Sequence, residues 1–469
     1  MPEIITLLSC LNETQDKLVI KQLSRVIMAM LVMTGRVTML GLSRWGEVGC
    51  SYRTIQRLFT SSIDWSKLMW QFFWAEMYCP GQTYVLIGDK TVVSKAGKVT
   101  YGLDRFFSST QSRPIKGLCF QVLALGSVEG NWSCPVDVTQ VVRNEEERAA
   151  TAKRKQSKAE AAQAAQAAQA AQAAQATQAT QAVAPRPSGR KKGSRNKDKV
   201  NVPLSPELTR LQTAVLRVMG LVAKCLDVHH LVLDGEYGHN AVAQMTKRCR
   251  LDIISKMRHD AALYLPYTGA YAGRGPHRKY GAKLKMDQLP GNALKATRCE
   301  GGFETRTYQL QLWHTEFPTL LNVVILVKIN LTTYQRAHVI LFSTDLALSA
   351  DKITQLYALR FQIEFNFRDA KQFWGLEDFM NVEPTPVLNA ASLSLFMTAI
   401  SARLLRDFRH HAPDAGVLDL KAVFRGHRYA NEALKFLPHF PQPILLSQIL
   451  AAVTNLGRIH PHFEPVTPA

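Results

Sequence analysis

Apolar and polar positions change their spacing from one segment of the chain to the next. Apolar residues recur at helical spacing through residues 18–42, and a second short helix is expected from residue 51, after a turn at residues 46–50. Such a helix-turn-helix pair can present its second helix to DNA, whereas a plain helical bundle would leave the same cations solvated. Both interpretations are open here. The residues that would face DNA are Tyr52, Arg53, Gln56 and Arg57.

Two apolar, β-branched runs each reach an aspartate. Residues 81–89 (GQTYVLIGD) predict a strand that stops at Asp89, and residues 230–234 (HLVLD) predict a buried strand that ends in Asp234. A side chain at the carboxyl end of a strand lies at the rim of the sheet, where ligands bind. Either aspartate alone is weak support for a site, because Asp is also common in turns and helix caps.

The segments around these strands alternate between helix and strand patterns. Strands are expected at residues 118–128 and 251–256, and helices at residues 204–226 and 240–250. A basic, Gly-rich hairpin is then expected at residues 269–285, with the cations Arg274, Arg278, Lys279, Lys283 and Lys285. Alternating patterns predict three further strands, at residues 308–313, 323–329 and 338–342. A mostly β segment therefore precedes the last part of the chain.

A low-complexity segment interrupts the chain after residue 145. Repeated A-A-Q triplets fill residues 161–182, and residues 186–199 (RPSGRKKGSRNKDK) carry seven cations and one anion. A three-residue repeat drifts around a 3.6-residue helix and keeps no fixed apolar face, so we expect a surface spacer that is at least partly helical. The basic tract suits phosphate contacts, and a solubilising linker is an equally good interpretation.

One long helix is expected over residues 350–374, which contain neither Gly nor Pro. Ser349 can cap its start, and Gly375 follows its last periodic residue. Four residues at offsets 0, 3, 7 and 14 would fall within about 60° on one helix face. Taken alone, this pattern also fits an ordinary solvated, charged face. The four residues are Tyr357, Arg360, Glu364 and Lys371.

Charge and cysteine content narrow the functional class. The 469 residues include 57 Lys and Arg against 37 Asp and Glu, and this net charge of +20 favours a polyanionic partner, above all nucleic acid. None of the eight cysteines forms a C-x-x-C pair, so neither a zinc ribbon nor a disulfide framework is indicated. We expect no signal peptide and no membrane span, and hence a cytoplasmic protein that associates with the nucleoid when bound to DNA.

The spacing Y-(2)-R-(3)-E-(6)-K of the four residues resembles the signature of the IS4-like insertion-sequence transposases. The surrounding sequence is most similar to the related IS701-type group, and the similarity extends over about residues 80–380. It is carried by the segments LIGDK, LVLDGEYG and YALRFQIEFNFRDAK.

This resemblance implies an α/β fold with an RNase H-like catalytic core, a mixed sheet flanked by helices, and a β-rich insertion. It also implies that Asp89, Asp234 and Glu364 form an Asp-Asp-Glu triad that binds two Mg²⁺ or Mn²⁺ ions. Carboxylate oxygens are the ligands that these ions prefer.

The resemblance further implies DNA contacts. Tyr357, Arg360 and Lys371 would bind phosphates near a base that flips out during hairpin formation. Phe361 follows the arginine, at a position where many relatives have Trp, and is a candidate stacking residue. Arg368 and Trp313 are further candidate DNA contacts, although the pattern around Trp313 favours an ordinary core role.

Seven regions follow from these patterns. We expect a helical, DNA-binding domain at 1–80, three core segments, a spacer, a β-rich insertion and a C-terminal helical region suited to dimerisation. After the first domain, the six remaining regions are 81–144 (core), 145–202 (spacer and basic tract), 203–257 (core), 258–345 (insertion), 346–385 (core, with the signature helix) and 386–469 (C-terminal helices).

The predicted function is that of a DNA transposase acting by cut-and-paste. It would bind double-stranded DNA at terminal inverted repeats, act as a homodimer on DNA, free 3′-OH ends through hairpin intermediates and join them to target DNA. Two alternatives are open: a catalytically silent, domesticated transposase that only binds DNA, and an RNase H-like nuclease that cuts without strand transfer.

Overall fold

The computed structural model describes residues 4–461 apart from 14, 48, 109–110, 151–152, 154–155, 158–159, 161–162, 164–197, 272, 274 and 440. The A-A-Q repeat beyond residue 163, the basic tract up to residue 197 and Arg274 of the predicted hairpin therefore lie outside the described residues.

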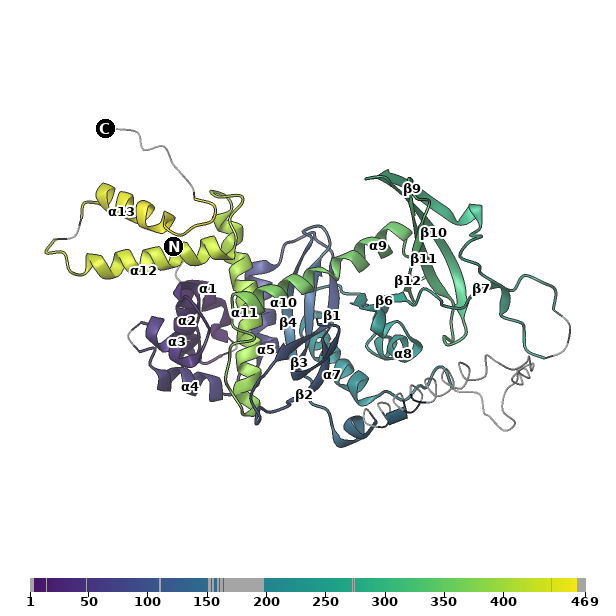
Figure 1. Cartoon of the computed structure of the whole chain (residues 1–469), viewed down its shortest axis with the longest axis horizontal. Helices are drawn as coiled ribbons and strands as arrows, with labels where there is room; N and C mark the ends of the chain where they lie inside the picture. Colours follow the sequence, from purple (N-terminus) through teal and green to yellow (C-terminus); the bar gives the residue numbers. More distant parts are fainter. Residues whose placement is uncertain are drawn as a thin grey trace, which may run out of the picture.

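A helical domain forms the N-terminal part of the chain (Figure 1). Side-chain oxygens of Thr38, Ser51 and Asp64 accept backbone N–H bonds at the starts of three of its helices. Helix α4 buries Ile55 and Leu58 on one side, which leaves its basic side at the surface. The elements are α1 (Ile4–Leu7), η1 (Leu8–Glu13), α2 (Lys17–Val32), α3 (Met39–Trp45), α4 (Tyr52–Thr60), α5 (Trp65–Phe72) and η2 (Phe73–Met77).

Within the described residues, twelve strands form one mixed sheet. Its central order is β4-β3-β1-β5-β6, in which β1, β5 and β6 are parallel and β3 runs antiparallel to β1 and β4. The first six strands are β1 (Tyr84–Ser94), β2 (Asp104–Ser108), β3 (Arg113–Ser127), β4 (Trp132–Gln140), β5 (His230–Leu233) and β6 (Asp252–Met257).

The prediction that the first strand stops at Asp89 is wrong. Strand β1 continues to Ser94, because its antiparallel partner β3 satisfies its backbone as far as the Ser94–Gly117 pair. The parallel pairing with β5 ends at Gly88 and Leu233. Asp89 therefore lies inside a strand, at the point where the neighbouring parallel strand ends.

The β-rich insertion extends the core sheet. Strand β12 pairs with β6, and β11 and β10 follow in the same sheet. The hairpin predicted at residues 269–285 is displaced: its first strand, β7, lies before residue 269, and only β8 falls within the predicted bounds. Strand β9 was not predicted. The strands are β7 (Leu263–Pro266), β8 (Tyr280–Lys283), β9 (Leu294–Glu300), β10 (Phe303–His314), β11 (Leu321–Asn330) and β12 (Arg336–Ser343), with η4 (Gly291–Ala293) before β9.

The prediction of one continuous helix over residues 350–374 is also wrong. Two helices, α9 (Ala350–Leu359) and α10 (Gln362–Gln372), are separated by a turn at Arg360 and Phe361. The turn is tightened by bonds of the i→i−3 type, from Arg360 N–H to the Tyr357 carbonyl and from Phe361 N–H to the Ala358 carbonyl. Such tight stretches within helical segments often mark functional positions. Here the Arg360 side chain is bound to β1, so a tertiary contact prevails over local helix propensity.

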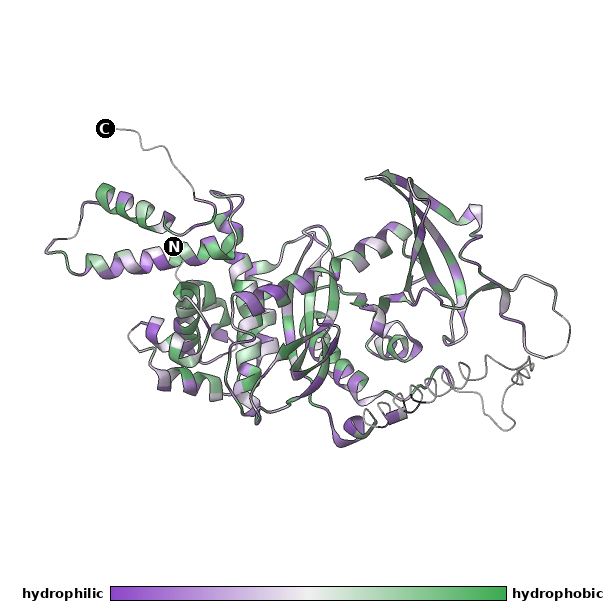
Figure 2. Ribbon diagram, in the orientation of Figure 1, coloured by the Kyte–Doolittle hydropathy of each residue, from purple (hydrophilic) through white to green (hydrophobic). Residues whose placement is uncertain are grey.

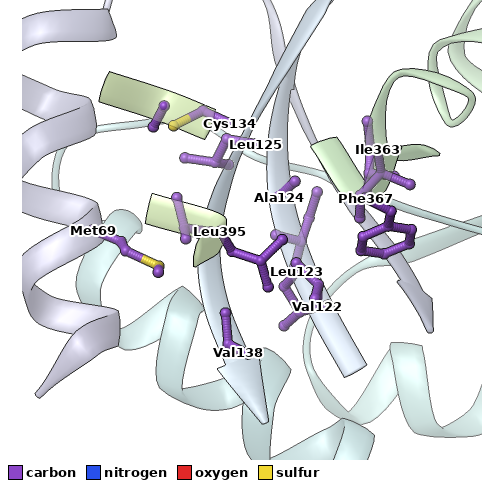
Figure 3. Packing of buried hydrophobic residues seen from close by; sticks show 14 of the residues in the cluster. Met69, Val122, Leu123, Ala124, Leu125, Cys134, Val138, Ile363, Phe367 and Leu395 are labelled. Carbon is purple, nitrogen blue, oxygen red and sulfur yellow. The ribbon is translucent and has the colours of Figure 1, made fainter. Parts of the chain in front are cut away.

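Further helices cover the sheet and connect it to the N-terminal domain. Figure 2 shows hydrophobic residues concentrated in the central strands and the helices packed on them. In Figure 3, side chains of α5, α10 and α11 meet those of β3 and β4 in one cluster. The remaining elements are α7 (Pro206–Val222), η3 (Gly235–Tyr237), α8 (Asn240–Arg248), α11 (Pro384–Phe408), α12 (Val417–Leu434) and α13 (Pro443–Asn455).

Helix α11 is long and apolar enough to cross a membrane by length and composition alone, a feature that the sequence analysis did not identify. However, 83% of its most apolar window is buried inside the fold. Asn389 of this helix accepts a bond from Trp65 Nε1 at 2.7 Å and donates to the carbonyls of Phe59 and Ser61 at 2.7 and 2.8 Å. Helix α11 is thus a core helix that joins the N-terminal domain to the sheet.

Candidate active site

The two predicted aspartates come from neighbouring parallel strands. Asp89 and Asp234 each follow the last paired residues of β1 and β5, Gly88 and Leu233. Their places in the sheet are therefore equivalent, side by side at the same edge. The backbone carbonyl of Asp234 accepts a bond from Ser255 Oγ at 2.9 Å, which attaches its segment to β6.

The third predicted acid reaches the same place from α10. Glu364 lies in the first turn of that helix, and Arg360 connects it to the strands. The Arg360 guanidinium donates to Asp89 Oδ2 and to Glu364 Oε1, both at 2.9 Å. Tyr357 O–H donates to Asp234 Oδ1 at 3.5 Å, the outer limit of a hydrogen bond. Tyr357 and Arg360 thus join three acids that lie far apart in the sequence.

Partial burial disfavours the charged forms of the side chains at this site. The side chains of Arg360 and Asp89 are only 14% and 19% exposed, and that of Glu364 is 41% exposed. Burial raises the pKa of Asp89 to about 6, although the Arg360 charge and the Lys90 backbone N–H lower it, and the neighbouring Asp234 and Glu364 raise it further. Burial also raises the pKa of Tyr357 to about 12. The Arg360 charge therefore compensates the ionised Asp89 carboxylate only in part.

The donor set fits a divalent metal ion. All three acids offer carboxylate oxygens, the ligands that Mg²⁺ and Mn²⁺ prefer. In the described part of the chain, no three His, Cys, Asp or Glu side chains stand close enough to share one ion. At this site the Arg360 guanidinium lies between Asp89 and Glu364 and bonds both. Arg360 Nε is buried and, among the described residues, has no hydrogen-bond partner. The arginine thus keeps one buried donor unused, and a divalent ion could take over its bonds to the acids.

A groove of about 930 Å³ surrounds the acids. Its volume lies at the upper end of the range of small-molecule sites, and its walls mix acidic, basic and aromatic side chains. Besides the acids and Arg360, the residues that form it include Lys90, Phe106, Phe107, Arg143, Glu207, Glu236, Arg368 and Lys371.

The predicted cations of α10 differ in their surroundings. Lys371 Nζ donates to the Val92 carbonyl of β1 at 2.9 Å and lies 3.8 Å from Glu377 Oε1, and burial lowers its pKa. Arg368 lies on the groove, where it pairs with Asp369 at 2.9 Å and keeps 58% of its side chain exposed. Both cations are near enough to the acids to contact the same polyanion.

Two predicted aromatic contacts lie outside the groove. Phe361 is 51% exposed and packs edge-on against Phe365, with ring centres 5.3 Å apart. Trp313 lies on β10 under Tyr280 and Lys279, with the Tyr280 ring centre at 6.0 Å and Lys279 Nζ at 5.1 Å. Neither residue lines the groove, so their DNA contacts stay predictions.

The structure adds a cluster around Lys90 that the sequence analysis did not find. Lys90 directly follows Asp89 in the sequence, and no local pattern marks its partner Glu207, which lies 117 residues away. The Lys90 ammonium lies 2.7 Å from Glu207 Oε1 and 3.2 Å from Glu236 Oε2. Only the fold brings these side chains together.

The strand order β4-β3-β1-β5-β6, flanked by helices, is that of an RNase H-like core, as predicted, and it places acidic side chains around one groove. Residues 6–316, well over half of the chain, match the family described as DDE superfamily endonuclease. The chain belongs to this family, whose members generally cut DNA with divalent metal ions such as Mg²⁺ or Mn²⁺. The match ends before Glu364, and a search of curated proteins found no match.

Proposed function

We propose that this chain is a transposase of the IS4-like, IS701-type group, with Asp89, Asp234 and Glu364 as its metal-binding triad. One observation carries the proposal. Acids from three distant segments are joined by Tyr357 and Arg360 in a single groove, and the two joining residues belong to the same Y-R-E-K signature. A chance pattern on a solvated helix would not converge with two strand aspartates.

The chemistry is phosphoryl transfer on DNA. Two bound Mg²⁺ or Mn²⁺ ions would activate a water or a 3′-OH and stabilise the leaving oxygen. The carboxylates of the triad would hold these ions, and the chain's own cations would orient the phosphate.

Arg360 has a role both before and after substrate binds. Its planar fork now bonds two carboxylates, and the same fork fits a phosphate. Lys371 adds a point charge from the next turns of α10, and Tyr357 adds an O–H donor. These three residues would hold a DNA phosphate beside the triad.

The remaining regions of the chain would contact the DNA and a second copy of the protein. The exposed side of α4, with Arg53 and Arg57, would contact the terminal inverted repeats of double-stranded DNA. Residues 386–469 would join two copies on the DNA, and residues 258–345 would contact the flanking duplex. We further propose that hairpin intermediates free the 3′-OH ends, and that the enzyme acts on the bacterial nucleoid.

A denaturing-gel cleavage assay with Mg²⁺ or Mn²⁺, on DNA that carries the native element end, tests this proposal. Wild type should give nicked or hairpin products that are then joined to a second duplex, and Glu364→Gln should bind the DNA but give none. Cleavage without joining would indicate a nuclease. Binding without products from either protein would indicate a non-catalytic DNA-binding protein. Metal-dependent cleavage by Glu364→Gln would refute the triad.

A further inference from the structure

Lys90 is a half-buried cation next to the first acid of the site. Its side chain is 20% exposed, and successive side chains of a strand point to opposite faces. Lys90 therefore leaves β1 on the face opposite to Asp89, whose carboxylate meets Arg360. The Lys90 ammonium lies 2.7 Å from Glu207 Oε1, 3.2 Å from Glu236 Oε2 and 5.1 Å from the centre of the Tyr237 ring.

The partners of Lys90 belong to the segment that carries the second acid. Glu236 and Tyr237 lie in η3, which begins directly after Asp234. Tyr237 O–H also donates to Glu207 Oε1 at 3.3 Å, and Glu207 lies in the first turn of α7. One ammonium thus holds together the strand of Asp89, the turn that follows Asp234, and a helix.

The Lys90 cluster connects the two acid-bearing segments at a point where no backbone pairing joins them. Within the described sheet, pairing between β1 and β5 ends at Gly88 and Leu233, one residue before each aspartate. Beyond that point, the ion pair from Lys90 to Glu236 joins the two acid-bearing segments. The Lys90 backbone N–H also donates to Asp89 Oδ1 at 2.7 Å. Groups that hydrogen-bond metal ligands commonly fix their orientation and tune affinity.

We propose that Lys90 is a positioning residue, which sets the separation of Asp89 and Asp234 for a shared pair of divalent ions. The inference rests on the proposed function. Lys90 also neutralises Glu207 and Glu236, so these two carboxylates do not compete with the triad for ions. Its ammonium is occupied by two carboxylates, which separates its role from the phosphate contacts of Arg360 and Lys371.

The test is the affinity for Mn²⁺ without DNA, measured by electron paramagnetic resonance on the full chain. Lys90→Met should weaken binding by about 10-fold or more, the range found when groups behind metal ligands are removed. Lys90→Arg keeps the charge and should restore most of the affinity. Lys95→Met is the matched control. Lys95 is half-buried and is the first residue after β1, and its ammonium donates to the carbonyls of Glu377 and Phe379 at 3.1 and 2.8 Å. It should bind Mn²⁺ like wild type.

Two further variants make the outcomes distinguishable. Glu236→Gln removes a partner whose side chain is 68% exposed, so it should fold even if Lys90→Met does not, and it should weaken Mn²⁺ binding in the same direction. Asp89→Asn tests the triad itself. If Asp89→Asn weakens binding while Lys90→Met and Glu236→Gln match wild type, the positioning role is overturned. If wild type binds no Mn²⁺, or Asp89→Asn binds it equally well, the proposed function fails.

Discussion

At the scale of single residues, Arg360 determines the electrostatics of the site. It is the only side chain among the described residues that bonds both Asp89 and Glu364, and its own pKa is raised because these acids outweigh the effect of burial. Asp89 nevertheless keeps a pKa of about 6. In the metal-free protein, the ionised Asp89 is therefore a destabilising group.

This cost predicts a pH-dependent effect of Asp89→Asn. Because burial raises the pKa of Asp89 to about 6, the folded protein binds more protons than the unfolded chain between about pH 4 and pH 6, and stability falls as pH rises through this window. At pH 7, Asp89→Asn should raise the free energy of unfolding of the metal-free protein by roughly 1–3 kcal/mol. Near pH 4 the difference should vanish, as measured by urea denaturation.

Asp345→Asn provides the opposite control. Burial works to raise the pKa of Asp345, but the Ala347 N–H and His230 bind its carboxylate and lower the pKa overall. Asp345→Asn should therefore reduce stability at pH 7. A destabilised Asp89→Asn at pH 7 would contradict the view that the Asp89 carboxylate is undercompensated.

At the scale of elements, α11 is the connection between domains, and Asn389 fastens it. The Asn389 side chain is 3% exposed and makes three hydrogen bonds to the N-terminal domain. Asn389→Ala should lower the free energy of unfolding by roughly 2–4 kcal/mol, because it leaves buried partners without bonds. The exposed Asn201→Ala should change it little. Thermal unfolding that is the same for both variants would contradict this role.

The short helix α4 carries a second prediction at this scale. Its apolar side packs into the core through Ile55, Leu58 and Phe59, so Arg53 and Arg57 can be replaced without loss of packing. A double change of both arginines to Ala should weaken binding to the element end while leaving thermal stability unchanged. Fluorescence anisotropy with labelled DNA measures this. Unchanged affinity would favour the plain helical bundle over a DNA-binding domain.

At the scale of the whole molecule, the net charge of +20 predicts that DNA affinity depends strongly on salt concentration. Phosphate contacts release counterions, so log K falls linearly with log salt. If about 6–10 phosphates are contacted, affinity should fall by about 10³–10⁵ between 50 and 200 mM salt. A titration series by anisotropy gives the slope. A flat dependence would contradict a binding surface made mainly of Lys and Arg.

Local sequence patterns predict several elements of the fold. The apolar run before Asp234 predicts β5, and the Ser349 cap predicts the start of α9. These features depend on residues close together in the sequence, whose periodicity and capping are readable without the fold. The two strand aspartates could be named on the same basis, whereas Glu364 and the cations of the signature were assigned by the resemblance to IS4-like transposases.

Other features depend on partners that are distant in the sequence. Strand β1 continues past Asp89 because β3 pairs with it, and the helix breaks at Arg360 because its side chain is bound to β1. The Lys90 cluster exists only because α7 and η3 pack beside β1. The sequence by itself determined which chemical groups the site has, since these are fixed by residue type and local pattern. Only the tertiary structure decided how those groups compensate one another's charge. Charge compensation depends on the distances between side chains whose segments are far apart in the sequence.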